Sequence, residues 1–363
     1  MKNVSQTIIA AALIAVLTGC GGGQRCIVDG SWSEEAADGS SIYLFDATNP
    51  ATPIDSAKVH DGRFSFSIEA AEPKMMTIYS RQGFAADFVA EPGRVSVSPD
   101  SIGGTTLNDR LQAYNERCST ADMDDEIQGY LMAYYAATDA SARAEAERIL
   151  DSLDRIAAWR TLTASSELYA ANPDNILGGV ALAALAESDT MTFSTFSSMV
   201  SKASAVVANY APVQKSLEVM RARDATSAGH HYTDIVGVDG KLSDLIDGHL
   251  ALVDFYASWC APCRAEIRDN IVPIWQKYEK KGLIVVGLNV WERGTREQRE
   301  AAHQKVMADL GITYPQLVDS TATATTTYSV MGIPEIMLIG PDGTILARGL
   351  RGDAIEEAVK KNL

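Results

Sequence analysis

Positive charge is scarce in this chain. The 363 residues include 31 lysines and arginines against 47 aspartates and glutamates, which gives a formal net charge of −16. Nucleic-acid binding requires a basic surface, so this balance argues against DNA or RNA as a partner. Hydrophobic residues make up 46% of the chain and charged residues 21%, a composition that excludes a largely disordered protein. At roughly 150 residues per domain, the length predicts two or three domains.

The N-terminal apolar segment is too short for a membrane-spanning helix. The run from Ile8 to Leu17 falls below the roughly 20 residues that a span requires. It follows Lys2 and precedes small residues, a pattern that predicts a secretory signal peptide over residues 1–20. Residues 17–20, Leu-Thr-Gly-Cys, also resemble the lipobox of bacterial lipoproteins. We therefore favour acylation of Cys20 over simple secretion, and we expect a flexible tether over residues 21–25.

Cysteine is rare as well. The chain has five cysteines, and four remain once the lipobox residue is set aside. Cys26 and Cys118 either pair in an oxidising compartment or stay separate as buried thiols, because spacing alone does not fix connectivity. Cys260 and Cys263 could form half of a zinc site, but such a site needs two more ligands at a matching spacing, and His303 stands alone. We therefore predict no metal site there.

Two adjacent histidines, His230 and His231, follow a predicted linker at residues 224–229. Neighbours in sequence rarely point at one ion, so we interpret the pair as a solvated linker or the start of a strand. Nothing else in the sequence indicates a metal, and we expect no bound cofactor.

The motif Trp-Cys-Ala-Pro-Cys at residues 259–263 is the most informative feature of the chain. It follows an apolar run at residues 251–257 and precedes a helix-like stretch at residues 264–281. Two cysteines at this spacing, where a strand turns into a helix, place the first sulfur beside free backbone N–H groups and the positive end of the helix dipole. A thiolate is stabilised there, so the motif predicts a redox-active dithiol.

Ahead of this motif the chain divides into a β-rich part and a helical part. Short β-rich runs separated by turn clusters predict a small antiparallel β domain over residues 26–106. Alternation places Phe64, Phe66 and Ile68 on one face of a strand, toward the core. Alanine, leucine, glutamate and arginine dominate residues 107–225 and predict a helical segment.

Two features of the helical segment are specific enough to test. Residues 142–162 carry an apolar stripe at helical spacing, formed by Ile149, Leu150, Leu153 and Ile156. Residues 172–175, Asn-Pro-Asp-Asn, break the pattern and offer a cap for a following helix over residues 176–185.

Residues 230–363 predict an α/β domain. From Asp234 onward we expect a strand, a short helix near residues 243–247, a strand ending at Ala257 and a helix that Pro273 kinks. A strand at residues 283–289, a helix near residues 297–310 and a hairpin of residues 336–339 and 345–348 complete the pattern. The fold class is therefore multidomain α+β: a small antiparallel β domain, a helical middle segment and a C-terminal α/β domain.

Residues 253–263, Val-Asp-Phe-Tyr-Ala-Ser-Trp-Cys-Ala-Pro-Cys, together with Gly-Ile-Pro at residues 332–334, resemble a thioredoxin-fold domain. The additional helix between residues 291 and 310 resembles the TlpA branch of extracytoplasmic thiol-disulfide oxidoreductases more than thioredoxin itself. Residues 54–57 and 61–64 are similar to the N-terminal domain found ahead of such modules in lipoproteins of Bacteroidetes-type bacteria. That second resemblance implies no chemistry.

The resemblance and the position of the motif assign catalytic roles. Cys260, at the helix N-terminus in partly exposed surroundings, is expected to be the attacking thiolate. Cys263, one turn further along, is carried inward and resolves the mixed disulfide. Asp254 lies in an otherwise apolar strand, where burial would raise its pKa and let it take the proton from Cys263, as the family's buried aspartate does. A solvated strand face is the alternative for Asp254.

The resemblance also implies a substrate-binding surface. Sequence context alone favours a trans bond before Pro334, since only about one X-Pro bond in twenty is cis. The family instead has a cis-proline beside the dithiol, and the preceding residue, here Ile333, pairs its backbone with a substrate strand. Trp259 is expected at the apolar rim of this surface rather than in the core, together with Ala261 and Pro262. Pro262 costs no hydrogen bond in the first helical turn.

These features imply a protein thiol-disulfide oxidoreductase that faces the periplasm. An aliphatic residue before the proline resembles reductants, so we expect a reductant of protein disulfides that a membrane electron donor keeps reduced. Glu335, where thioredoxin has threonine, leaves substrate preference open. Gly21 does not resemble an inner-membrane retention signal, which favours the outer membrane for the lipid anchor.

Two other functions remain as alternatives. A thiol peroxidase of the peroxiredoxin type would need its proline and threonine at the positions of Val253 and Ala257, where neither is present. A binding or assembly lipoprotein would make the redox module subordinate, but the retention of both motif cysteines argues for redox activity.

Overall fold

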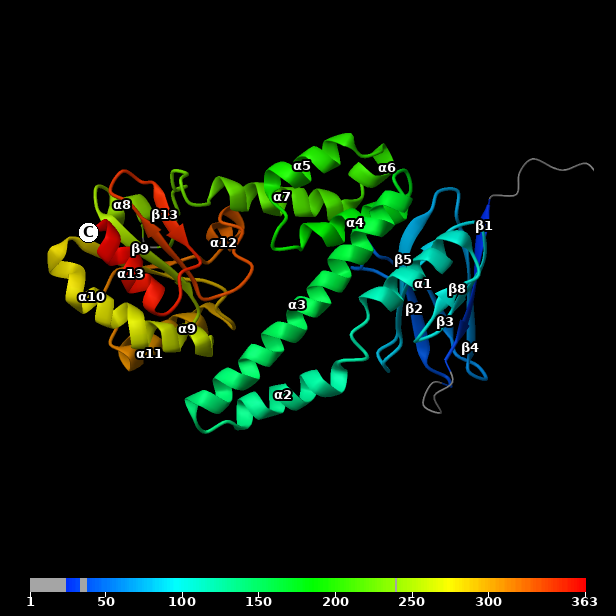
Figure 1. Cartoon of the computed structure of the whole chain (residues 1–363), viewed down its shortest axis with the longest axis horizontal. Coiled ribbons are helices and arrows are strands. Elements are labelled where there is room, and N and C mark those ends of the chain that lie inside the picture. Colours follow the sequence, from blue (N-terminus) through cyan, green and yellow to red (C-terminus); the bar gives the residue numbers. More distant parts are fainter. Residues whose placement is uncertain (1–23, 33–37, 239) are drawn as a thin grey trace, which may run out of the picture. The chain divides into compact units, whose positions relative to one another are not determined.

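The computed structural model describes residues 24–32, 38–238 and 240–363 (Figure 1). The predicted signal peptide, its acylated Cys20 and the first residues of the tether lie outside the described residues. The chain forms two compact units. One comprises the described residues up to Ser188 with Ala203–Pro212, and the other comprises Asp189–Lys202 with Val213–Leu363. Within the described ranges, no helix combines the length and hydrophobicity of a membrane span.

The first unit contains two four-stranded sheets, in the orders β4-β1-β7-β8 and β3-β2-β5-β6. Every strand pair is antiparallel except β1 with β7, which is parallel. The antiparallel region expected from the sequence is therefore confirmed, with one parallel pair added. The strands are β1 Arg25–Ser31, β2 Ser41–Asp46, β3 Asp55–Lys58, β4 Arg63–Glu69, β5 Lys74–Tyr79, β6 Ala85–Ala90, β7 Gly93–Val97 and β8 Ile102–Gly103.

Aromatic side chains pack among aliphatic ones in the core of the first unit. Phe64 and Phe66 are buried on the same face of β4, and Ile68 packs partly buried against the same cluster, as the alternation predicts. The ring of Phe64 packs edge-on against Phe84 with centroids 5.3 Å apart. A Cβ at Gly30, on the neighbouring strand, would lie 2.1 Å from the Phe64 ring, so only glycine permits this approach of backbone and ring.

Helices follow the strands. In the first unit they are α1 Thr106–Cys118, α2 Asp124–Ala136, α3 Ala140–Ala171, α4 Ile176–Ala186 and α6 Ala205–Ala208. Helix α5 Phe193–Lys202 and nearly all of α7 Ala211–Ala225 belong to the second unit. Asn175 caps α4 by accepting a hydrogen bond from the backbone of Leu177, which confirms the predicted cap. The stripe predicted on α3 is wrong at one position: Leu153 is buried, but Ile156 is 42% exposed.

The second unit contains a five-stranded sheet in the order β11-β10-β9-β12-β13. β9, β10 and β11 are parallel, and β12 runs antiparallel to both β9 and β13. The elements are α8 Leu242–Ile246, β9 Leu250–Tyr256, α9 Ala261–Glu266, a π-helical turn Ile267–Ile271, α10 Val272–Tyr278, a 3₁₀ turn Glu279–Lys281, β10 Leu283–Asn289, α11 Arg296–Leu310, β11 Gln316–Val318, α12 Thr323–Thr327, β12 Glu335–Ile339, β13 Ile345–Arg348 and α13 Asp353–Asn362. Together with the first unit, this confirms the expected fold class.

Alternate residues of β9 serve two separate apolar cores. Leu252 and Tyr256 belong to a core with α9, α10, α11 and α13, which also includes both motif cysteines. Val253 and Phe255 belong to a core with α8 and α12 on the opposite face of the sheet. Because side chains alternate along a strand, Asp254 projects to the same face as the cysteines.

Two expectations for the second unit need correction. No strand begins at Asp234; this stretch forms only an isolated bridge between Val236 and Lys241. The Asp234 carboxylate accepts hydrogen bonds from the backbone N–H groups of Ile235 and Ser243, contacts that compete with strand pairing. The helix expected over residues 264–281 is divided by the π-helical turn just before Pro273, whose missing N–H removes one α-helical hydrogen bond. The finer domain boundaries remain a proposal.

Candidate active site

Cys260 and Cys263 form a disulfide at the start of α9, with an S–S distance of 1.96 Å. Cys260 occupies the N-cap position, and its Sγ accepts a hydrogen bond from the backbone N–H of Cys263 at 3.2 Å. Pro262 lies in the first helical turn, where its missing N–H leaves no intrahelical bond unmade. Cys263 is fully buried, and Cys260 keeps 4% exposure, which is less than the sequence led us to expect. Of the pair, only Cys260 keeps any exposed surface.

Asp254 is buried on the cysteine-bearing face of β9. The residue has no exposed surface, and neither carboxylate oxygen has a hydrogen-bond partner among the described residues. The alternative of a solvated strand face is therefore wrong. Burial raises the pKa of Asp254 from its ordinary value of 3.8 to about 8; the charge of Glu266 raises it further, and that of Arg351 lowers it. Near neutral pH this carboxyl can therefore exchange a proton.

The segment after α12 brings a proline to the site. The Ile333–Pro334 peptide bond is cis, as the resemblance implies. The carbonyl oxygen of Ile333 lies 3.8 Å from Cys260 Sγ, so this segment borders the redox pair directly. Ile333 is partly buried, Pro334 is buried, and Met331 is 72% exposed. Ile333, Pro334 and Met331 thus form an apolar strip that begins beside Cys260 Sγ and continues to the surface.

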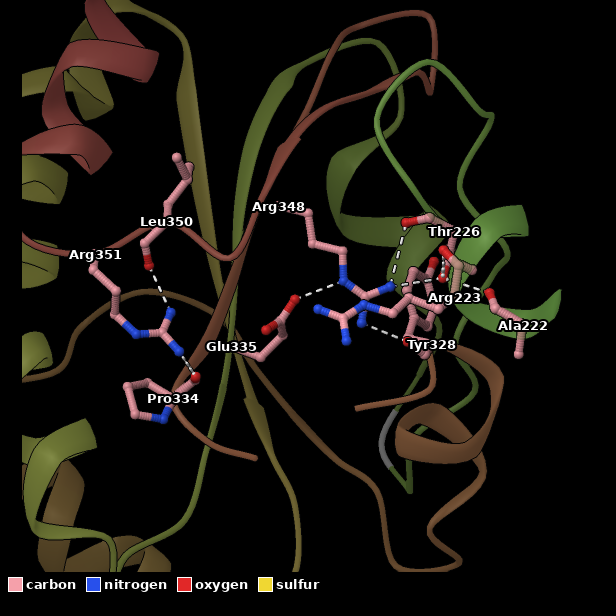
Figure 2. Close-up of polar contacts among 9 residues, drawn as sticks. All are labelled: Ala222, Arg223, Thr226, Tyr328, Pro334, Glu335, Arg348, Leu350 and Arg351. Atoms are coloured by element: carbon pink, nitrogen blue, oxygen red, sulfur yellow. Dashed lines mark hydrogen bonds and ion pairs between the residues drawn. The ribbon is translucent and has the colours of Figure 1, made fainter. Parts of the chain in front are cut away.

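Arg351, in the loop between β13 and α13, holds this segment from one side. Its guanidinium donates to the carbonyl oxygen of Pro334 (Figure 2). The next residue, Gly352, donates its backbone N–H to Glu266 of α9 at 2.8 Å. Arg351 therefore lies among the proline segment, the cysteine-bearing helix and the buried carboxyl whose pKa it lowers.

A second loop holds the tryptophan beside the first cysteine. Trp259 is 43% exposed, and its indole N–H donates to the carbonyl oxygen of Trp291 at 2.9 Å. The guanidinium of Arg293 lies 4.0 Å from the centroid of its ring. Glu292 accepts from both the backbone N–H and the hydroxyl of Ser258, at 2.6 and 2.7 Å. Trp259, Ala261 and Pro262, the neighbours of Cys260 in sequence, are all exposed.

Glu292, Arg293 and Arg351 were not singled out from the sequence. One signal could have found the first two. β9 and β10 are parallel neighbours, so the loop after Asn289 leaves the sheet at the same edge as the cysteine motif. Arg351 gave no such signal, because its contact depends on how β13 turns toward α13.

The remaining cysteines do not join this site. Cys26 is buried and Cys118 is partly exposed, and within the described ranges both are free thiols. The question of their pairing, open from the sequence, is thus answered in favour of separate thiols. Burial raises the pKa of Cys26. His231 stacks on Tyr232, and His303 is buried beside Tyr256. No group of three or more potential metal-binding side chains occurs in the described part of the chain.

Two regions of the chain match different family models. Residues 224–348 match the AhpC/TSA family, and residues 26–111 match a domain of unknown function, DUF4369. Among solved structures, the thioredoxin domain of a thiol-disulfide oxidoreductase from Bacteroides vulgatus is 25% identical, with a TM-score of 0.33. It covers 37% of this chain and 96% of that one.

Curated relatives match about a third of the chain. The thiol:disulfide interchange protein HelX of Rhodobacter capsulatus is 34% identical over 122 residues, which cover 33% of this chain and 62% of HelX. The thiol:disulfide interchange protein CycY of Rhizobium leguminosarum is 33% identical over 32% of this chain and 58% of CycY. The thiol-disulfide oxidoreductase ResA of Bacillus thuringiensis is 23% identical over 36% of this chain and 71% of ResA. The chain thus spans less than two thirds of HelX and CycY.

Proposed function

We propose that this protein exchanges disulfides with protein substrates and acts as a reductant. Residues 224–348 match the thioredoxin-fold AhpC/TSA family, and relatives of the chain are named thiol:disulfide interchange protein and thiol-disulfide oxidoreductase. The observation that carries the proposal is the Cys260–Cys263 disulfide at a helix N-terminus beside the Ile333–Pro334 segment. A thiolate at the first position gains from the free N–H groups and the helix dipole.

The exchange proceeds through a mixed disulfide. In the reduced protein, the Cys260 thiolate attacks one sulfur of the substrate disulfide, and the other substrate sulfur leaves as a thiolate. The Cys263 thiolate then attacks Cys260 Sγ, which restores the disulfide and releases the first substrate sulfur. Two electrons pass to the substrate. A separate dithiol donor, for which we propose a membrane protein, must reduce the pair before the next cycle.

Asp254 supplies the base for the second attack. Cys263 is fully buried and must lose its proton before it becomes a nucleophile. The carboxyl on the same face of the sheet has a pKa of about 8, close to that of a free thiol, so a proton can pass in either direction near neutral pH. A carboxyl with an ordinary pKa would be too weak a base for this step.

The substrate chain lies along the proline segment. The peptide groups of Ile333 and Pro334 border Cys260, and an extended substrate can pair with the backbone of Ile333 there. Trp259, Ala261 and Pro262 form the other side of this surface. The aliphatic Ile333 before the proline supports the reducing direction.

We further propose that the mature chain begins at an acylated Cys20 and faces the periplasm, with the outer membrane as its location. Residues 17–20 and the short apolar run before them support this proposal. Metabolic labelling with a radioactive or alkyne fatty acid tests it, because Cys20→Ala should abolish incorporation. Label retained on the variant would contradict it.

Two substitutions test the redox function. Cys260→Ser should abolish the dithiol-dependent reduction of insulin, because the attacking sulfur is lost. Cys263→Ser should instead accumulate a mixed disulfide with the substrate, visible as a higher-mass band on non-reducing gels, because attack proceeds without resolution. If Cys260→Ser still reduces insulin, the proposed function is wrong.

The reduction potential of the pair tests the direction. Equilibration with graded thiol buffers, followed by trapping of free thiols, should give a value near about −270 mV, as for thioredoxin. A value near about −120 mV would make the protein an oxidant that installs disulfides.

A further inference from the structure

The segment after cis-Pro334 carries an ion pair that the redox chemistry does not use. Glu335, the first residue of β12, accepts a hydrogen bond from Arg348 Nε of β13 at 2.6 Å (Figure 2). The side chains are 15% and 11% exposed. Met337 is the cross-strand partner of Arg348, so Glu335 lies diagonally across from it on the same face. Met337 belongs to the core opposite the cysteines, which places this ion pair on that face.

The rest of the Arg348 guanidinium binds the residue that follows helix α7 and the residue that follows helix α12. Its Nη1 donates to the hydroxyl of Thr226 at 2.8 Å, and Nη2 donates to the carbonyl oxygen of Tyr328 at 2.5 Å. Thr226 is 1% exposed, and its hydroxyl donates in turn to the carbonyl oxygen of Ala222 in the last turn of α7. One arginine thus joins α7 to the residue that follows the cis-proline.

Backbone pairing strengthens the same attachment. Gly229 donates to the carbonyl oxygen of Ile345 on β13, and Ile345 donates to that of His230, both at 2.8 Å. The chain leaving α7 therefore runs beside β13, the strand that carries Arg348. A displacement of this end of α7 would move the acceptor hydroxyl away from a buried arginine. A buried charge that loses a partner is costly, so α7 and Glu335 favour one common arrangement.

We propose that Arg348 is a positioning residue, which couples the end of α7 to the substrate-binding segment Ile333–Pro334 through Glu335. Arg348 does not touch the sulfurs. It fixes the first residue of β12, while Arg351 holds the carbonyl oxygen of Pro334 on the other side. The last helix of the helical segment thereby sets the path of the backbone on which a protein substrate pairs. This inference rests on the proposed function.

Comparing the reduction of a protein disulfide with that of a small disulfide separates this positioning role from a general structural one. A protein disulfide pairs along Ile333 and needs the segment in place, whereas bis(2-hydroxyethyl) disulfide needs only an accessible Cys260. Thr226→Val removes the hydroxyl that Arg348 binds and leaves no new charge buried. Ser227→Ala is the matched control, because that hydroxyl contacts the carbonyl oxygen of Asp224 and the ring of His230 and does not contact Arg348.

In the full chain, Thr226→Val should raise KM for insulin by roughly three- to tenfold, as coupled neighbouring residues do, with kcat little changed. Reduction of the small disulfide should change less than about twofold, and Ser227→Ala should leave both substrates unaffected. Glu335→Gln should raise KM for insulin as well. Adding Thr226→Val to it should cause no further loss, because both act through Arg348.

Three results would overturn the coupling: equal effects of Thr226→Val on both disulfides, an effect of Ser227→Ala as large as that of Thr226→Val, or additive effects of the double substitution. The failure of the proposed function looks different. In that case the unsubstituted chain reduces neither disulfide, and both proposals fall together.

Discussion

Replacing Asp254 with asparagine should change how stability depends on pH. The carboxyl is fully buried without a hydrogen-bond partner among the described residues, and its pKa is about 8 instead of 3.8. Between these values the unfolded chain has lost the proton while the folded protein still binds it. Stability therefore falls as pH rises through this window, and levels off above the folded pKa.

The size of the effect follows from the two pKa values. At about 1.36 kcal/mol per pKa unit, the change from 3.8 to about 8 corresponds to a maximum penalty of about 6 kcal/mol above pH 8. About 4 kcal/mol of this develops between pH 5 and pH 8. Asparagine stays neutral throughout, so any cost or gain from its amide is the same at every pH.

Hydrogen exchange of peptides covering β9, measured against denaturant concentration at several pH values, gives the stability of this domain for both proteins. Relative to the natural chain, Asp254→Asn should gain about 4 kcal/mol between pH 5 and pH 8. Val253→Ala in the opposite core is a suitable control, because its cost should not depend on pH. A difference between Asp254→Asn and the natural chain that stays within about 1 kcal/mol over this range would refute the buried, protonated carboxyl.

Other parts of the structure make independent predictions. Glu292→Gln weakens two short hydrogen bonds to Ser258, so it should lower the free energy of unfolding of the redox domain by about 1–3 kcal/mol and slow insulin reduction. An unchanged denaturation curve and an unchanged rate would contradict the role of the Glu292 loop in holding the cysteine motif. In the native oxidised protein, a maleimide reagent should label Cys118 and leave Cys26 unmodified, because only Cys118 is partly exposed; mass spectrometry that finds Cys26 labelled would show that this core opens. Phe66→Ala should destabilise the β-sheet unit by about 3–5 kcal/mol in chemical denaturation, and a loss below about 1 kcal/mol would mean that the core refills the space.

The cysteine motif and its elements could be predicted because local signals sufficed. The strand before Cys260, the helix after it and the hairpin around Gly343 each depend on neighbours in sequence. Gly343 has φ of 82°, a left-handed conformation that glycine adopts without strain, so the Pro-Asp-Gly turn predicted the hairpin correctly. The parallel neighbours β9 and β10 then place the motif where the carboxyl ends of both strands leave the sheet.

The environment of Asp254 could not be predicted from the strand alone. The residues around it are apolar on both faces, so alternation does not show which side a carboxylate takes. Only the assignment of Leu252 and Tyr256 to the cysteine-bearing core decides it. Ile156 illustrates the opposite case: its helical spacing was correct, but nothing in the described residues packs over that turn of α3 closely enough to bury it.

Contacts distant in sequence explain the other omissions. Arg348 and Thr226 are 122 residues apart, and no periodicity in either segment indicates that they meet. Glu335 stood out only as a departure from thioredoxin. Its partner became evident from the register of β12 with β13, which turn geometry sets and composition does not.

The π-helical turn after α9 bears on how the chain tolerates changes in length. There the backbone N–H of Val272 donates to the carbonyl oxygen of Ile267, five residues earlier, so this turn contains one residue more than an α-helical turn. Deleting one residue from Ile267–Ile271 would convert the turn to α-helix and keep the apolar residues of α10, such as Trp275 and Tyr278, facing their core. The same deletion within α10 would rotate the residues beyond it by about 100° and turn them away. A one-residue deletion in the π-helical turn should therefore disturb the core less than the same deletion in α10.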